Sequence, residues 1–169
     1  MRCSQAAIME ASMKCQKNVD SVVVLDEEYM TPAFTRSQPY VLVADDDRDI
    51  LAVIMLLLET EGYAGLGFAD SRKVLPFLMQ AEQGLEKDLR LPAVVLLDLM
   101  MPGISGYDIA AWLNMHPWGA HVPVIVMTAD DRIHSASDIR GASDWLSKPF
   151  QIDVLLEKLE RYLAPSRLP

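Results

Sequence analysis

The sequence predicts an α/β fold, a three-layer sandwich with helices on both faces of a five-stranded parallel sheet. Two observations carry this prediction. From Tyr40 onward, strand-like and helix-like patterns alternate along the chain. The strand-like runs are short, continuous and apolar, which is typical of parallel strands that are buried on both faces. A hydrophobic content of 51% supplies the core that such a fold needs.

Five segments have the composition of buried strands, and polar residues or turn formers bound each of them. They are residues 41–44, 64–68, 94–97, 124–127 and 142–147. Five helical patterns accompany them, at residues 49–62, 70–83, 105–115, 132–140 and 152–163. Pro76 predicts a kink or a late start in the second helix. The fourth helix is the weakest, because Ser135 and Ser137 compete for backbone hydrogen bonds.

The first 38 residues do not share this alternation and are predicted to form a flexible N-terminal tail. Their short apolar stretches have no partner that the sequence reveals. Two other interpretations stay open, a docking segment that folds on a partner and a chain that truly starts at Met30. The domain itself is assigned to residues 39–165, with a C-terminal tail at 166–169.

The charge balance restricts the partners of the chain. It carries 24 acidic and 15 basic residues, a net charge of −9, and no basic cluster, so we expect no direct binding of nucleic acid. The apolar run at residues 52–58 is far too short to span a membrane. Cys3 and Cys15 lack the spacing of a metal site and fit a reducing compartment. We therefore expect a soluble, cytoplasmic protein.

Polar residues follow four of the predicted strands at the point where each strand ends. They are Asp45 and Asp46 after the first strand, Asp98 after the third, Thr128 after the fourth and Lys148 after the fifth. In open parallel sheets, ligands bind beyond the carboxyl ends of the strands, so these side chains are expected at one edge. Carboxylates are ligands that Mg²⁺ prefers, and the ion would relieve the repulsion between neighbouring aspartates. The edge is a candidate site for Mg²⁺ and a phosphoryl group.

Each of these residues also has an ordinary structural explanation. Asp45 and Asp46 also fit a solvated acidic turn. Asp98 is either a turn aspartate before Pro-Gly or a nucleophile toward phosphorus. Thr128 either bonds to local backbone or donates to a phosphoryl oxygen. Lys148 is either a solvated surface lysine or, if its bond to Pro149 is cis, a cation turned back toward the site, where it can pair with Asp98.

The order of these residues resembles the receiver domain of two-component response regulators. The resemblance spans residues 40 to about 163, and the matching stretches are VLVADDD, VVLLDLMMPGISG, VIVMTAD and DWLSKPF. It implies a flavodoxin-like fold with strand order 2-1-3-4-5. It also implies that Asp98 is the phosphoacceptor and that Asp45, Asp46 and Asp98 hold Mg²⁺. The backbone carbonyl of Met100 would be a further metal ligand.

The resemblance assigns roles to three more residues. Thr128 and Lys148 would contact the phosphoryl group, and Thr128 together with Trp145 would form the switch. Two features depart from the family pattern. The interval from Thr128 to Lys148 is short, and Trp145 stands where a Tyr or Phe is usual. Both fall on the face that receivers usually present to partners, so we expect an altered output surface.

The expected function is that of a stand-alone response regulator receiver. A histidine kinase or histidine phosphotransfer protein would donate a phosphoryl group to Asp98, and the modified domain would switch its contacts with a downstream protein target. A homodimer is also possible. We expect no enzyme activity beyond assistance to its own phosphorylation and dephosphorylation. The alternatives are a degenerate receiver that binds partners without phosphorylation and a phosphatase with an aspartate nucleophile. Met100 counts against the phosphatase, because such enzymes usually carry an aspartate at that position.

Overall fold

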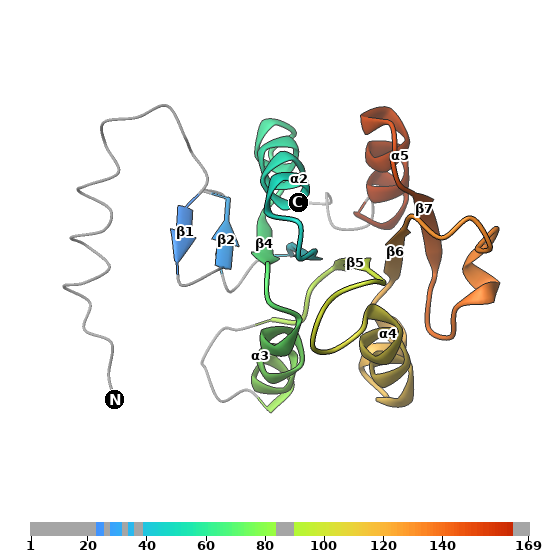
Figure 1. Cartoon of the computed structure of the whole chain (residues 1–169). Helices are drawn as coiled ribbons and strands as arrows, with labels where there is room; N and C mark the ends of the chain where they lie inside the picture. The colour runs from blue at the N-terminus through green and yellow to red at the C-terminus, as the bar shows by residue number, and fades with distance from the viewer. Residues whose placement is uncertain (1–22, 26–27, 32–33, 36–38, 84–89, 164–169) are drawn as a thin grey trace.

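A computed structural model describes residues 23–25, 28–31, 34–35, 39–83 and 90–163. A seven-stranded sheet lies at its centre, in the order β1-β2-β4-β3-β5-β6-β7 (Figure 1). The strands are β1 (Val23–Leu25), β2 (Glu28–Met30), β3 (Val41–Ala44), β4 (Gly65–Phe68), β5 (Val94–Asp98), β6 (Val124–Thr128) and β7 (Asp144–Ser147). The strands from β3 to β7 are parallel to one another, and their order confirms the predicted 2-1-3-4-5 arrangement.

Helices cover both faces of the sheet, as the sequence predicts. Figure 1 shows α2 (Arg48–Thr60) and α5 (Ile152–Leu163) on one face, and α3 (Ser71–Gln83) and α4 (Gly106–Met115) on the other. Each face has its own buried core. Alternate residues of β3 point to opposite cores, so Leu42 packs with α3 and α4 while Val43 packs with α2 and α5. The three-layer, flavodoxin-like α/β fold is confirmed.

Local sequence signals determine where the helices begin. The Asp47 side chain caps α2 by accepting hydrogen bonds from the amides of Asp49 and Ile50. The Ser105 hydroxyl caps α4 in the same way. Helix α3 begins at Ser71 and continues through Pro76, so the late start considered above does not occur. Among the described residues, no helix is both long and apolar enough to cross a lipid bilayer.

The five predicted strands are all present, but the described sheet has two more, because β1 and β2 come from the segment that was expected to be a flexible tail. Strand β2 pairs antiparallel with β4, and β1 pairs antiparallel with β2. The Thr31 hydroxyl accepts a hydrogen bond from the Gly65 amide at 2.8 Å. Tyr29 is 7% exposed and packs in the core on the α2 side. Residues 1–22 of the predicted tail and the C-terminal tail at 166–169 lie outside the described residues.

Two glycines of β4 make room for this addition. A Cβ atom at Gly67 would lie 3.1 Å from the Tyr29 Cβ and 2.9 Å from the Leu51 Cδ1. A Cβ atom at Gly65 would lie 3.2 Å from the Thr31 Cγ2. Side chains from α2 and from the N-terminal segment therefore pack directly over the β4 backbone. The edge of the five parallel strands is closed by the chain's own β2.

The helix predicted at residues 132–140 does not form, which leaves four α-helices among the described residues rather than the five predicted. That segment contains only a short 3-10 helix, η2 (Ala136–Asp138), besides η1 (Gly119–His121) after α4. The Asp138 carboxylate accepts hydrogen bonds from the amides of His134 and Ser135, both at 2.9 Å, and so holds a turn. Ile133 and Ile139 are 7% and 3% exposed and anchor the segment to the core.

Candidate functional site

The carboxyl ends of β3, β5, β6 and β7 bring the predicted site residues together. Asp98 and Thr128 are the last residues of β5 and β6. Asp45 and Lys148 directly follow β3 and β7. The parallel register between these neighbouring strands holds the four ends at one edge of the sheet. The structure therefore confirms that these four side chains come from adjacent strand ends.

The Lys148 ammonium contacts two buried carboxylates. Its Nζ lies 2.7 Å from Asp45 Oδ2 and 3.0 Å from Asp98 Oδ2. The side chains of Lys148, Asp45 and Asp98 are 14%, 0% and 9% exposed. The Lys148 amide also donates to the Thr128 carbonyl at 2.7 Å, and the bond from Lys148 to Pro149 is cis. Lys148 thus reaches Asp98 as expected, and it also pairs with Asp45.

Burial and charge act in opposite directions on this pair. Burial raises the pKa of Asp45 above its usual range, and the hydrogen bond and charge of Lys148 offset only part of that effect. Burial also works to lower the pKa of Lys148, but the hydrogen bond and charge of Asp45, with a further contribution from Asp98, outweigh it and raise that pKa. Lys148 therefore keeps its positive charge at neutral pH, and that charge favours the ionised form of Asp45.

Three carboxylates form a cluster that fits Mg²⁺. Asp45, Asp46 and Asp98 each offer an oxygen, and these oxygens all lie within 4.8 Å of one another. Counted with their formal charges, three carboxylates and one ammonium carry a net charge of −2, which a divalent cation would balance. Mg²⁺ takes oxygen ligands and retains several waters, and the exposed Asp46 leaves the cluster open to solvent on one side. The donor set, the charge and the access all suit this ion.

Met100 and Thr128 lie beside the cluster. The Met100 amide donates to Asp98 Oδ1 at 3.2 Å, which holds the start of the loop after β5 against the carboxylate. The Thr128 hydroxyl oxygen accepts the Asp130 amide at 3.0 Å, so its own proton is available to another acceptor. Thr128 is 1% exposed. The Met100 carbonyl as a metal ligand stays a prediction.

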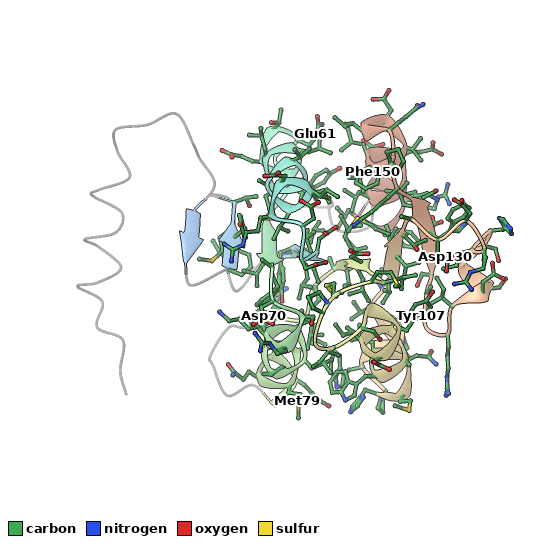
Figure 2. All side chains as sticks on the ribbon, in the orientation of Figure 1. Glu61, Asp70, Met79, Tyr107, Asp130 and Phe150 are labelled. Carbon is green, nitrogen blue, oxygen red and sulfur yellow. The ribbon has the colours of Figure 1, made fainter. Side chains whose placement is uncertain are left out.

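Trp145 lies on β7 and is half-buried. It packs against the core on the α3 and α4 side of the sheet, which also includes Ile133 and Ile139 of the segment between β6 and β7. Figure 2 shows Asp130 at the start of that segment, where its carboxylate pairs with Arg132 at 2.6 Å. The position suits a residue that senses the segment, and the switching role of Trp145 stays a prediction.

Sequence reasoning missed two residues that support the site. The Asp47 amide donates to Asp45 Oδ1 at 3.0 Å, which orients that carboxylate while the Asp47 side chain caps α2. An N-cap aspartate before a helical pattern is a signal that could have shown it. The Ser71 hydroxyl bonds to Pro102 and Ile104, which are 31 and 33 residues away in the sequence. No local signal reveals contacts over that distance.

Solved structures of receiver domains are similar to this chain. A signal receiver domain of a signal transduction histidine kinase from Syntrophus aciditrophicus superimposes with a TM-score of 0.64 at 26% identity, and the match covers 78% of this chain and 94% of that one. The receiver domain of the Francisella response regulator 1452 gives a TM-score of 0.62 at 28% identity, with 77% and 100% covered. The fold and the residues at its strand ends define a receiver.

The family model for the response regulator receiver domain matches residues 41–160, and the chain belongs to this family, whose members act in two-component phosphorelay signalling. It is 33% identical over 127 residues to the uncharacterized transcriptional regulatory protein YkoG of Bacillus subtilis. It is 29% identical over 136 residues to the DNA-binding dual master transcriptional regulator RpaA of Synechocystis sp.. These matches cover 73% and 78% of this chain but 50% and 52% of the relatives, so the chain spans about half their length.

Proposed function

We propose that Asp98 accepts a phosphoryl group from a phosphohistidine on a histidine kinase or a histidine phosphotransfer protein. The resulting aspartyl phosphate then changes how the domain contacts a downstream protein. One observation carries this proposal. Asp98 Oδ2 is 3.0 Å from the Lys148 ammonium, and the same carboxylate shares a cluster with Asp45 and Asp46 that suits Mg²⁺.

The transfer exchanges one bond to phosphorus for another. An Asp98 carboxylate oxygen attacks the phosphorus while the phosphorus–nitrogen bond to the donor imidazole breaks. The electron pair of the broken bond stays on the imidazole, and an acyl phosphate forms on Asp98. Asp98 is only 6% exposed, so the donor reaches it from the open side beside Asp46. Later attack by water releases inorganic phosphate and restores the carboxylate.

Two positive charges beside Asp98, a bound Mg²⁺ and the Lys148 ammonium, would balance the negative charge of the phosphoryl group. Asp45, Asp46 and Asp98 would hold Mg²⁺, with the Met100 carbonyl as a further ligand. When bound there, the ion neutralises negative charge on the phosphoryl oxygens. Lys148 pairs with Asp98 before transfer, and its raised pKa keeps it cationic for contact with the phosphoryl group afterwards.

The Thr128 hydroxyl connects the site to the segment between β6 and β7. Phosphorylation adds a charge of about −1.5 to −2, to which the Thr128 hydroxyl can donate. Its oxygen already accepts the Asp130 amide, so a movement of Thr128 changes the first turn of that segment. Trp145 packs against the same core as Ile133 and Ile139 of the segment, so it would respond to the same movement. The surface formed by residues 129–143 then differs between the two states, and the downstream protein distinguishes them.

A small donor with a phosphorus–nitrogen bond tests the proposal. The chain is incubated with phosphoramidate in MgCl₂ or in EDTA, and its mass is measured intact. We expect one added phosphoryl group in MgCl₂ alone, and its loss in hydroxylamine, which cleaves acyl phosphates. Asp98→Asn should gain no group. Asp153→Asn, at an exposed position on α5, is the matched control and should behave as the wild type.

The same experiment separates the other two functions. A folded wild-type chain that gains no phosphoryl group would point to a degenerate receiver. Steady turnover of phosphomonoesters, abolished in Asp98→Asn, would point to a phosphatase instead. Each result would contradict the proposed role of Asp98 as a phosphoacceptor in signalling.

A further inference from the structure

One buried hydroxyl connects two loops at the phosphorylation edge. Ser71 is the first residue of α3 and is 1% exposed. Its hydroxyl donates to the Pro102 carbonyl at 2.7 Å and accepts from the Ile104 amide at 3.0 Å. Both partners lie on the loop from Leu99 to Ser105, which directly follows Asp98. A side chain that lies outside the loop thus bridges the two backbone groups of its turn.

This loop has fixed points on either side of Met100. Before Met100, the Leu99 amide donates to the Met127 carbonyl at 3.2 Å, and the Leu99 carbonyl accepts the Gly106 amide at 3.1 Å. After Met100, the hydroxyl of Ser71 holds the backbone at the turn described above. The hydrogen bonds of Ser71 therefore connect α3 to the part of the loop that follows Met100 and restrain it.

The loop backbone also passes very close to the start of α3. Gly103 has a φ of +89°, a conformation that glycine adopts without strain. A Cβ atom at Gly103 would lie 3.2 Å from the Ser71 Oγ and 3.1 Å from the Arg72 Cγ. Figure 2 shows Asp70 at this junction, before the start of α3. The glycine allows the approach, and the Ser71 hydroxyl makes the contact specific.

We propose that Ser71 is a positioning residue for the phosphorylation site, because it holds the loop that carries the Met100 carbonyl beside Asp98. The inference rests on the proposed function, in which that carbonyl is a metal ligand. Mg²⁺ demands nearly ideal octahedral geometry, with ligands at about 2.0–2.1 Å, so a loop that samples other positions binds it less well. Ser71 touches neither the metal nor the phosphoryl group. It acts by restricting the backbone of the loop from Leu99 to Ser105, which carries the Met100 carbonyl.

Loss of the hydroxyl should loosen the loop without unfolding the domain. A surface cavity of about 310 Å³ borders the junction and is lined by Ala69, Asp70, Arg72, Pro102 and Gly103. In Ser71→Ala, water can reach the released Pro102 carbonyl and Ile104 amide through this cavity. The backbone groups therefore find new partners, but they lose the fixed geometry that Ser71 imposes.

The test compares Ser71→Ala with a matched control at the opposite edge of the sheet. Thr31 is 2% exposed, and its hydroxyl likewise bridges an amide and a carbonyl, from Gly65 at 2.8 Å and to Tyr63 at 3.3 Å. Thr31→Val removes that bridge far from the strand ends that carry the site. We expect both variants to lower the unfolding midpoint by similar amounts, since each loses two hydrogen bonds of one buried hydroxyl.

Of these two variants, only Ser71→Ala should weaken Mg²⁺ binding. In an NMR titration with MgCl₂, its apparent Kd for Mg²⁺ should rise about five- to tenfold, whereas Thr31→Val stays close to the wild type. In EDTA, hydrogen exchange at the Ile104 amide should accelerate in Ser71→Ala and remain unchanged in Thr31→Val. Gly103→Ala, which crowds the same contact from the loop side, should weaken Mg²⁺ binding in the same direction.

The outcomes separate this inference from the proposed function. A wild-type chain that binds Mg²⁺ and a Ser71→Ala chain that binds it equally well would overturn the positioning role alone. Equal weakening of Mg²⁺ binding in Thr31→Val would also overturn it, because the effect would then be one of general stability. A wild-type chain that binds no Mg²⁺ would overturn the proposed function and this inference together.

Discussion

The phosphorylation edge and the segment between β6 and β7 are built on different principles. The ion pair between Lys148 and Asp45 joins residues 103 positions apart in the sequence and is almost completely buried. The segment 129–143 is held by short-range hydrogen bonds, such as those that Arg132 donates to Asp130 and His134 donates to Asp138, and by two buried isoleucines. Tertiary packing of parallel strands thus fixes the site, while local turns shape the segment that would report its state. A change in the segment should therefore leave the site intact.

The largest expected effect comes from Lys148→Met, which leaves two buried carboxylates without their cation. In EDTA this variant should lose about 3 kcal/mol of unfolding free energy. Mg²⁺ should restore much of that loss, because the ion can balance Asp45 and Asp98 once the ammonium is gone. Urea denaturation with and without MgCl₂, followed by tryptophan fluorescence, measures both quantities.

A similar ion pair at the amino-terminal end of β7, away from the phosphorylation site, provides the control. Lys158 Nζ lies 2.6 Å from Asp144 Oδ1, with side chains 18% and 12% exposed. Lys158→Met should also lose stability, but MgCl₂ should not restore it. If Mg²⁺ stabilised the two variants to the same extent, the acidic cluster would not be the binding site of the ion.

A smaller loss is expected in the segment between β6 and β7. Ile139→Ala removes a side chain that is 3% exposed and should cost about 2 kcal/mol of unfolding free energy, the lower end of the usual range, because the segment can collapse into the space. The folded variant should accept a phosphoryl group at the wild-type rate, because no contact of the site depends on Ile139. A rate well below that of the wild type would show that the segment and the site are not separable.

The pH dependence of stability follows from the raised pKa of Lys148. A group whose pKa is higher in the folded state stabilises the fold fully below its unfolded pKa, here about 10.4, and loses that contribution as pH rises through the folded value. The difference in unfolding free energy between the wild type and Lys148→Met should thus be constant near neutral pH and shrink above about pH 10.5. Urea midpoints measured from neutral to alkaline pH give this curve. A difference that grew with rising pH would contradict the ion pair.

The smallest effect is expected from Arg132→Ala. The Arg132 side chain is 89% exposed, and exposed ion pairs contribute little to stability. Hydrogen bonds from Arg132 lower the pKa of Asp130 to about 2, so any contribution is present above the usual aspartate pKa and disappears only as pH falls through about 2. Thermal midpoints at neutral pH should match the wild type. A loss as large as that of Ile139→Ala would mean that this pair is a structural anchor.

The two regions also differ in how far the sequence predicts them. Four site residues each follow a predicted strand, namely Asp45, Asp98, Thr128 and Lys148. Because a parallel sheet brings such strand ends to one edge, the sequence pattern was sufficient to predict that these residues lie together. The segment at 132–140 was not predictable as a turn, because the outcome depends on Asp138 bonding to His134 and Ser135 rather than on helical periodicity. The addition of β2 was missed because it depends on two glycines of β4 that lie more than 30 residues away.

The most direct test identifies the residue that carries the phosphoryl group. After incubation with phosphoramidate and MgCl₂, borohydride converts an aspartyl phosphate to homoserine, and peptide mass spectrometry locates it. We expect homoserine at position 98 alone, because Asp98 contacts Lys148 at 3.0 Å and its side chain is 9% exposed, whereas the side chain of Asp45, which also contacts Lys148, is completely buried. Homoserine at position 45 or 46, or an adduct that persists in Asp98→Asn, would contradict the central claim that Asp98 is the phosphoacceptor.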